Sequence, residues 1–228
     1  MSLSRLIISS TAFLVLQAAR LLAAGNAWYD FAHDHVLGTS LDLHFQAASP
    51  EAASRAESAA LAEIDRLAGI LSGYDANSEF SRWAATRDRP VAVSGDLFAV
   101  LGLYDAWRQH THGTLEAATE AAAQLWRRAA QRGSAPTDDE LATTVRAMQG
   151  RHWQLDPANR TATHLTDTPL RLNSFTKGYI IDRAAAAALS AGPLETAVVN
   201  IGGDLVIRGG SAQVVTVTDP SASADNEA

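Results

Sequence analysis

The sequence predicts an α+β domain rather than a strictly alternating α/β fold. Residues 41–45 alternate apolar and polar side chains, which is typical of a half-buried strand. Apolar residues recur at helical spacing over 61–71, and a short apolar run at 197–201 is typical of a buried strand. The 228 residues are 47% hydrophobic, which is enough for a sizeable core. We find no internal repeat and no linker long enough to separate two domains.

The first 27 residues are predicted to be a signal peptide, followed by one domain over residues 28–228. Arg5 gives a thin basic start, and Leu6–Leu16 form an apolar run. Gly25 and Ala27 are small residues at −3 and −1 of a cleavage after Ala27. An uncleaved anchor or a cytosolic amphipathic helix is the alternative. We therefore expect export to the periplasm, without a lipid anchor because the chain has no cysteine.

Turn and cap residues define the first half of the domain. Ser49-Pro50 ends the strand over 41–45, and the helix that contains the apolar pattern of 61–71 ends near Ser72-Gly73. Tyr74 then lies on a loop, either as a ligand contact or as a plain rim aromatic, and Ser78 caps a short helix. The next expected elements are a strand at 91–93, a helix capped by Ser94, a loop at 110–116, a helix at 116–131, a helix opened by the capping box 137–140, and strands at 153–155 and 161–165.

The stretch from Leu172 to Asp204 carries the strongest indication of a binding site. Lys177-Gly178 is expected where an irregular segment becomes the helix 179–190, which residues 191–193 end. The strand 197–201 then enters Gly202-Gly203. Paired glycines let backbone amides approach a ligand, and a cation near a helix start favours phosphate. A plain turn is the equally weighted alternative.

The C-terminal residues predict one more strand at 213–217, followed by a polar tail. A sheet-forming segment so near the end leads us to expect a domain truncated within a larger unit.

Composition and motifs exclude several functions. The net charge of −7 argues against nucleic acid as a partner, and the lack of cysteine excludes disulfides and thiolate zinc sites. The pairs His33/His35 and His110/His112 would each share one face of a strand, which is compatible with a metal site. Neither pair has an obvious third ligand, so solvated loop histidines are the favoured alternative.

Several short segments occur in a characteristic order along the chain. They are Leu37-Gly38-Thr39, residues 72–81, Gly113-Thr114-Leu115-Glu116, Leu125-Trp126, Lys177-Gly178-Tyr179 with Asp182, and Asn200-Ile201-Gly202-Gly203-Asp204. Over roughly residues 36–220, their order and spacing resemble the ApbE family, the FAD:protein FMN transferases.

This resemblance implies an ApbE-like, T-fold-related architecture, a mixed sheet with packed helices. Such enzymes bind FAD and Mg²⁺, cleave the FAD pyrophosphate and attach FMN to a threonine or serine hydroxyl of a target protein, releasing AMP. The implied partners are FAD and an exported acceptor flavoprotein, for example in a membrane-associated redox complex. A non-catalytic FAD-binding protein and a periplasmic interaction domain are the alternatives.

The resemblance also assigns site residues. Lys177 is the implied catalytic and FAD-contacting lysine, and the Ser174 backbone carbonyl is the implied metal ligand. Arg171 stands where the family has an FAD-contacting aspartate, a reversal of charge. The other implied cofactor contacts are Leu37, Tyr74, Thr114, Leu115, Glu116, Gly202 and Gly203. The carboxylates that complete the family's Mg²⁺ shell have no match. This leaves three alternatives open for the chain alone: a fragment, half of a split enzyme or an inactive homologue.

Overall fold

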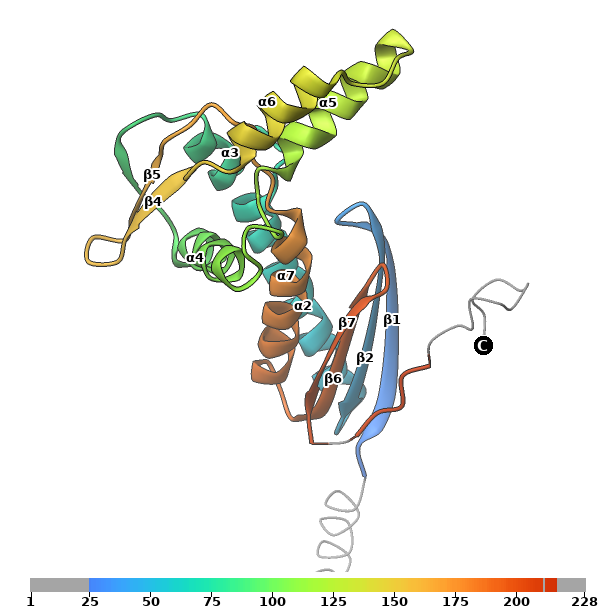
Figure 1. Ribbon diagram of the computed structural model, residues 1–228. Helices are drawn as coiled ribbons and strands as arrows, with labels where there is room; N and C mark the ends of the chain where they lie inside the picture. Colours follow the sequence, from blue (N-terminus) through green and yellow to red (C-terminus); the bar gives the residue numbers. More distant parts are fainter. Residues whose placement is uncertain (1–24, 211, 217–228) are drawn as a thin grey trace, which may run out of the picture.

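The computed structural model describes residues 25–210 and 212–216 and has the predicted α+β class (Figure 1). Among these residues, no helix combines the length and apolarity needed to cross a membrane. The elements are β1 Ala27–Val36, β2 Thr39–Ala47, α2 Pro50–Leu71, α3 Glu79–Ala84, β3 Pro90–Ala92, α4 Gly95–His110, α5 Thr119–Arg132, α6 Asp138–Met148, β4 Trp153–Asp156, β5 Thr161–His164, α7 Asn173–Ser190, β6 Leu194–Ile201 and β7 Asp204–Gly209.

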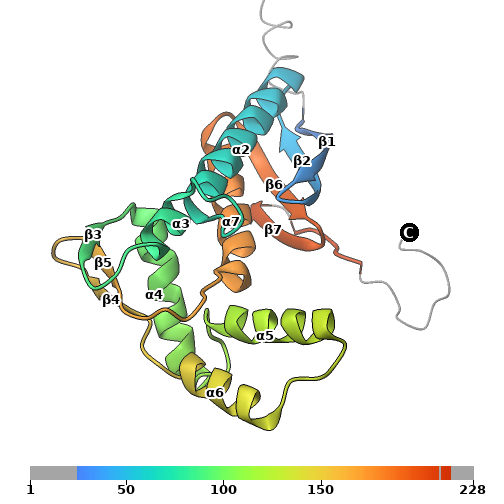
Figure 2. The ribbon, with the colours of Figure 1, turned by 90° about the horizontal axis from the view of Figure 1, so that it is seen from above.

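A four-stranded antiparallel sheet, in the order β1-β2-β6-β7, forms one half of the fold. The helices α2 and α7 pack against each other and cover one face of this sheet (Figures 1 and 2). Leu41, Leu43 and Phe45 of β2 point into this layer and are fully buried, which confirms the predicted alternation. Val199 of β6 pairs with Leu43 and is equally buried, so neighbouring strands contribute to one apolar surface.

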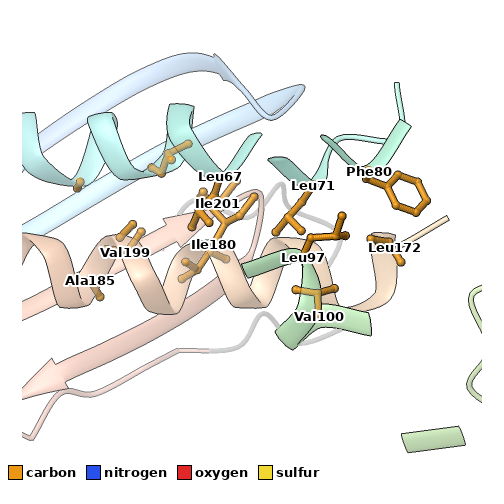
Figure 3. Close-up of a cluster of buried hydrophobic side chains, with 14 of the residues drawn as sticks. Leu67, Leu71, Phe80, Leu97, Val100, Leu172, Ile180, Ala185, Val199 and Ile201 are labelled. Atoms are coloured by element: carbon orange, nitrogen blue, oxygen red, sulfur yellow. The ribbon is translucent and has the colours of Figure 1, made fainter. Parts of the chain in front are cut away.

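The hydrophobic core continues from this layer into the second half of the fold (Figure 3). Leu67 of α2, Ile180 of α7 and Ile201 of β6 converge near the sheet, and Leu71 and Leu97 extend the cluster toward α4. Each of these side chains is at most 1% exposed, and burial of one such aliphatic side chain contributes about 1.5–3 kcal/mol. This shared core connects the four-stranded sheet to the α3–α4 region.

The second sheet has three antiparallel strands in the order β3-β5-β4. Trp83 of α3 packs on it, and its indole Nε1 donates to the Ala162 carbonyl at 3.1 Å. The predicted helix caps are confirmed, because Ser78 accepts from Ser81 N and Ser94 from Leu97 N.

Two predicted helix starts were wrong. α7 begins at Asn173 instead of Tyr179, so Lys177 lies in the helix and not at its start. The N-cap, Leu172, has no capping side chain and therefore gives no sequence signal. α5 begins at Thr119 instead of residue 116, because the buried Glu116 carboxylate holds the turn before it by accepting the backbone N–H of Ala117 at 2.8 Å.

Strand predictions failed at both ends of the described chain. β1 was not predicted, since its residues mix charge with aromatic groups and both its faces are partly exposed. The expected strand at 213–217 is absent over residues 212–216, where Val214 is 96% exposed and no ladder pairing is formed, while Val217 lies outside the described residues. Most of the predicted signal peptide, residues 1–24, also lies outside them.

Candidate functional site

The first turn of α7 is held in place by a buried tyrosine. Ser174 N donates to the Tyr104 hydroxyl at 3.2 Å, and that hydroxyl donates to the Arg171 carbonyl at 3.3 Å. Burial raises the pKa of Tyr104, which keeps its hydroxyl protonated and able to donate. The Ser174 carbonyl is inside α7, where a carbonyl accepts the N–H four residues on. Only its second lone pair is open to another partner.

Tyr74 lies beside this helix start, and the residue as a whole is 80% exposed. Its hydroxyl accepts from Asn173 Nδ2 at 3.1 Å, and the Arg171 guanidinium carbon lies 4.4 Å from its ring centroid. Ser72 Oγ accepts the backbone N–H of both Tyr74 and Asp75 at 3.1 Å, which shapes the loop. The loop tyrosine and the α7 start are therefore brought together.

The loop before α5 also contacts the segment that leads into α7. Arg171 N donates to the Ala117 carbonyl at 2.9 Å, which joins this loop to the segment before α7. The Glu116 carboxylate points inward, with Oε2 2.7 Å from Arg108 Nε. Thr114 is exposed and Leu115 packs partly against the core. Glu116, one of the implied cofactor contacts in this loop, is therefore engaged by Ala117 N and Arg108 within the protein.

Lys177 lies about one turn further along α7 and faces the β6–β7 hairpin. Its Nζ is 3.2 Å from Asp204 Oδ2. Asp204 is the first residue of β7 and directly follows Gly202-Gly203. The predicted juxtaposition of the lysine with the paired glycines is therefore present, although the lysine is not at the helix start.

Gly202 and Gly203 form the two-residue turn of this hairpin, at φ values of 57° and 91°. Gly202 N donates to the Ser40 carbonyl at 3.1 Å, and Gly203 N donates to Asn200 Oδ1 at 3.0 Å. Both amides are thus hydrogen-bonded within the protein, as in the plain turn that was the alternative interpretation.

The β1–β2 hairpin ends next to this turn. Leu37 and Gly38 form its two central residues, at φ values of 51° and 82°. A Cβ added to Gly202 would lie 2.7 Å from the Thr39 side chain, so the two hairpin ends are in contact. Leu37 is 38% exposed at this edge. The structure therefore places Leu37, Gly202 and Lys177 at one end of the large sheet.

The histidine pairs do not form metal sites. The register of β1 breaks between His33 and Val36, and His35 has a φ of 63°, so the alternation that would align the pair is lost. His33 Nε2 instead lies 2.9 Å from Glu57 Oε1. Within residues 25–210 and 212–216, no group of three or more His, Asp or Glu side chains is placed to hold a metal ion.

A surface pocket of about 510 Å³ lies between the end of α4, the following loop and α6. Gly113 and Glu116 line it, whereas Tyr74, Ser174 and Lys177 do not. The α7 candidates therefore form a surface site, separate from this pocket.

Three contacts were not expected from the sequence: the Arg171–Tyr74 stacking, the Asn173 hydrogen bond and the Lys177–Asp204 pair. In the sequence, Asp204 appeared only as the last residue of the segment that contains the paired glycines. The i, i+4 spacing of Asn173 and Lys177 would have placed both on one helix face had the true start of α7 been known.

Comparison with known proteins gives both a family and structural relatives. Residues 37–228 match the ApbE family, whereas no curated protein sequence matches the chain significantly. The flavin transferase ApbE from Vibrio cholerae aligns with a TM-score of 0.67 and 20% identity, over 81% of this chain and 60% of that one. The apo flavinyl transferase ApbE from Pseudomonas stutzeri gives 0.69 and 17%, over 81% and 62%. The ApbE protein from Thermotoga maritima gives 0.65 and 23%, over 79% and 59%.

At these identities the structural matches establish the fold. The chain spans about three fifths of the length of these structures. The family match, in contrast, extends over most of the chain. The chain belongs to the ApbE family.

Proposed function

We propose that this chain is the FAD-binding part of a flavin transferase, which moves FMN from FAD to a threonine or serine hydroxyl of an acceptor flavoprotein. The observation that carries the proposal is the convergence of Lys177, the Gly202-Gly203 hairpin and Tyr74 around the first two turns of α7. A lysine cation and a planar tyrosine ring at the first two turns of one helix match the two chemically distinct parts of FAD, its pyrophosphate and its isoalloxazine.

Each group has a separate role in binding. Lys177 Nζ leaves Asp204 and neutralises pyrophosphate oxygens, a charge-assisted interaction. Tyr74 offers an exposed ring for stacking, and Leu37 adds an exposed apolar contact at the hairpin end. In the transfer, the bond between the two phosphates breaks, AMP leaves with the bridging oxygen, and the acceptor hydroxyl oxygen bonds to the FMN phosphorus as it loses its proton.

The described residues do not fit a magnesium site. Mg²⁺ requires near-octahedral oxygen coordination, and the described part of the chain offers the Ser174 carbonyl without a carboxylate cluster beside it. When bound, Mg²⁺ would neutralise charge on the phosphates. No step of the transfer is therefore assigned to metal-binding residues of this chain.

The proposal includes an exported enzyme whose acceptor belongs to a membrane-associated redox complex. Export is supported by the basic start and the apolar run of residues 6–16. Periplasmic fractionation of the expressed full chain, with sequencing of its mature N-terminus, tests this point.

The function is tested in two stages. Calorimetric titration with FAD measures binding, and incubation with FAD, Mg²⁺ and an acceptor peptide is followed by mass spectrometry for an FMN adduct and chromatography for AMP. Adduct and AMP together support transfer. FAD uptake without AMP, even when the remaining length of a family member is supplied as a second chain, favours the non-catalytic FAD-binding alternative. Absence of FAD uptake contradicts both and favours an interaction domain.

A further inference from the structure

Arg171 connects the Tyr74 loop to two other elements. Its Nη1 donates to the Gly73 carbonyl at 2.6 Å, and its Nη2 lies 3.2 Å from Glu120 Oε1 on α5. The same guanidinium covers one face of the Tyr74 ring at 4.4 Å. One side chain thereby fixes both the backbone of the loop and the orientation of its aromatic ring.

Gly73 makes this approach possible. A Cβ at position 73 would lie 2.8 Å from Arg171 Cδ and 3.1 Å from its Nη1. Real Cβ atoms essentially never approach another heavy atom within 3.0 Å, so any larger residue at position 73 would displace the arginine side chain. The glycine and the arginine form a matched pair, although they are 98 residues apart.

Glu120 fixes the orientation of the Arg171 guanidinium through its carboxylate. Its carboxylate is nearly buried, and it also accepts from Arg127 Nη2 at 2.5 Å. Burial alone would raise the pKa of Glu120, but the hydrogen bonds from Arg171 and Arg127 outweigh it and lower that pKa. The carboxylate therefore stays ionised and holds Arg171 in position at neutral pH.

We propose that Arg171 is a positioning residue that holds Tyr74 as a stacking platform for the isoalloxazine ring of a flavin. The inference rests on the proposed function and deepens it. Arg171 covers one face of the ring, while Tyr74 as a whole remains 80% exposed. Asn173 fixes the hydroxyl of the platform and lies four residues, about one helical turn, before Lys177.

This assignment differs from a direct contact with the phosphates. The Arg171 guanidinium is only partly exposed and is occupied by the Gly73 carbonyl and Glu120. It therefore acts on the ligand through Tyr74. A consequence is that its loss should affect ligands that carry a flavin ring and spare those that carry only the adenine and phosphates.

The test is a titration of the wild-type chain, Arg171→Met, Tyr74→Ala and the double variant with FAD, FMN and ADP. We expect Arg171→Met to weaken FAD and FMN by about 2- to 5-fold, the range of an exposed cation–π contact, and to leave ADP unchanged. The double variant should bind the flavin ligands no more weakly than Tyr74→Ala alone, because both substitutions remove the same stacking platform. The flavin bound to Arg171→Met should also be more fluorescent, since a stacked tyrosine quenches it.

A matched control is Arg183→Met, which removes a second arginine–tyrosine stacking, that of Arg183 5.0 Å over Tyr179, with both residues on α7. It should leave all three affinities unchanged. Thermal unfolding of each variant tests folding. If Arg171→Met is unfolded, Arg171→Lys replaces it, because lysine keeps the charge but lacks the guanidinium that contacts both the Gly73 carbonyl and Glu120. An intermediate loss is expected for the lysine variant.

Three results would overturn this inference and leave the proposed function intact. They are an equal loss of ADP affinity in Arg171→Met, an unchanged flavin affinity in Arg171→Met, and additive losses of flavin affinity in the double variant. A wild-type chain that binds neither FAD nor FMN would instead overturn the proposed function, and the inference with it.

Discussion

Removing the charge of Asp204 should make the chain bind FAD more tightly. The Asp204→Asn variant keeps the size of the side chain and releases Lys177 from a pair at 3.2 Å. The two side chains are 62% and 35% exposed, and exposed pairs of this kind contribute about 0.2–1 kcal/mol. The lysine gives up this energy when it moves to the pyrophosphate. The expected gain in FAD affinity is therefore about 1.5- to 5-fold.

The opposite change, Lys177→Ala, removes the cation itself. A charge-assisted hydrogen bond to phosphate is worth ~1–3 kcal/mol, so FAD affinity should fall roughly 5- to 150-fold. The stability of the fold should change by less than about 1 kcal/mol, since the pair is exposed.

Calorimetric titration at low and high salt measures both effects, and the gain in Asp204→Asn should shrink as salt screens the pair. Asp182→Asn is the matched control, because Asp182 forms a comparable pair with Arg208 between α7 and β7, at 2.6 Å and 44% exposure on both sides. It should leave FAD affinity unchanged. Unaltered binding in Lys177→Ala, with intact folding, would refute the assignment of Lys177 to the pyrophosphate.

Three further predictions concern the scaffold. Gly202→Ala should destabilise the fold by about 1–3 kcal/mol in urea denaturation, because φ is positive and the new Cβ meets Thr39. Gly203→Ala keeps the strain of a positive φ but meets no atom within 4 Å, so it should cost less. Burial lowers the pKa of His164, so the unfolded chain binds more protons than the folded chain between the unfolded pKa of about 6.5 and the lower folded pKa. Stability should therefore fall as pH drops through about 6.5 toward that lower pKa, and His164→Asn should flatten this slope. Thr137→Ala should cost about 1 kcal/mol through loss of its capping box, and an unchanged midpoint would contradict this.

The sequence was sufficient wherever one local signal decided the structure. The alternation around Leu43 predicted β2, and Ser94 predicted the start of α4, because a cap and a two-residue period act within a few positions. It was insufficient where the stabilising partner is distant. α7 starts at Asn173 because Tyr104, 70 residues away, holds the Ser174 amide, and no local pattern reports such a contact.

The candidate site shows the same division. The order of motifs led to Tyr74, Lys177 and the paired glycines, since each is encoded at its own position. From the sequence, Arg171 was interpreted only as a reversal of charge. Its structural role depends on Gly73 and Glu120, which are distant in the sequence. Gly73 leaves room for the aliphatic part of the Arg171 side chain, and the buried Glu120 carboxylate holds its guanidinium. With these two partners, the arginine at the position of reversed charge supports Tyr74.

Binding and transfer are therefore expected to be separable in this chain. The groups proposed to contact the flavin ring and the pyrophosphate converge around the first two turns of α7, and each is held by protein contacts that need no metal. The carboxylates that Mg²⁺ requires are not gathered beside Ser174 among the described residues. FAD affinity should consequently persist in a chelator such as EDTA, whereas FMN transfer should require magnesium together with ligands from another segment. Loss of FAD binding in the chelator would show that the metal helps to build the flavin site, and would contradict a separation of FAD binding from metal-dependent transfer.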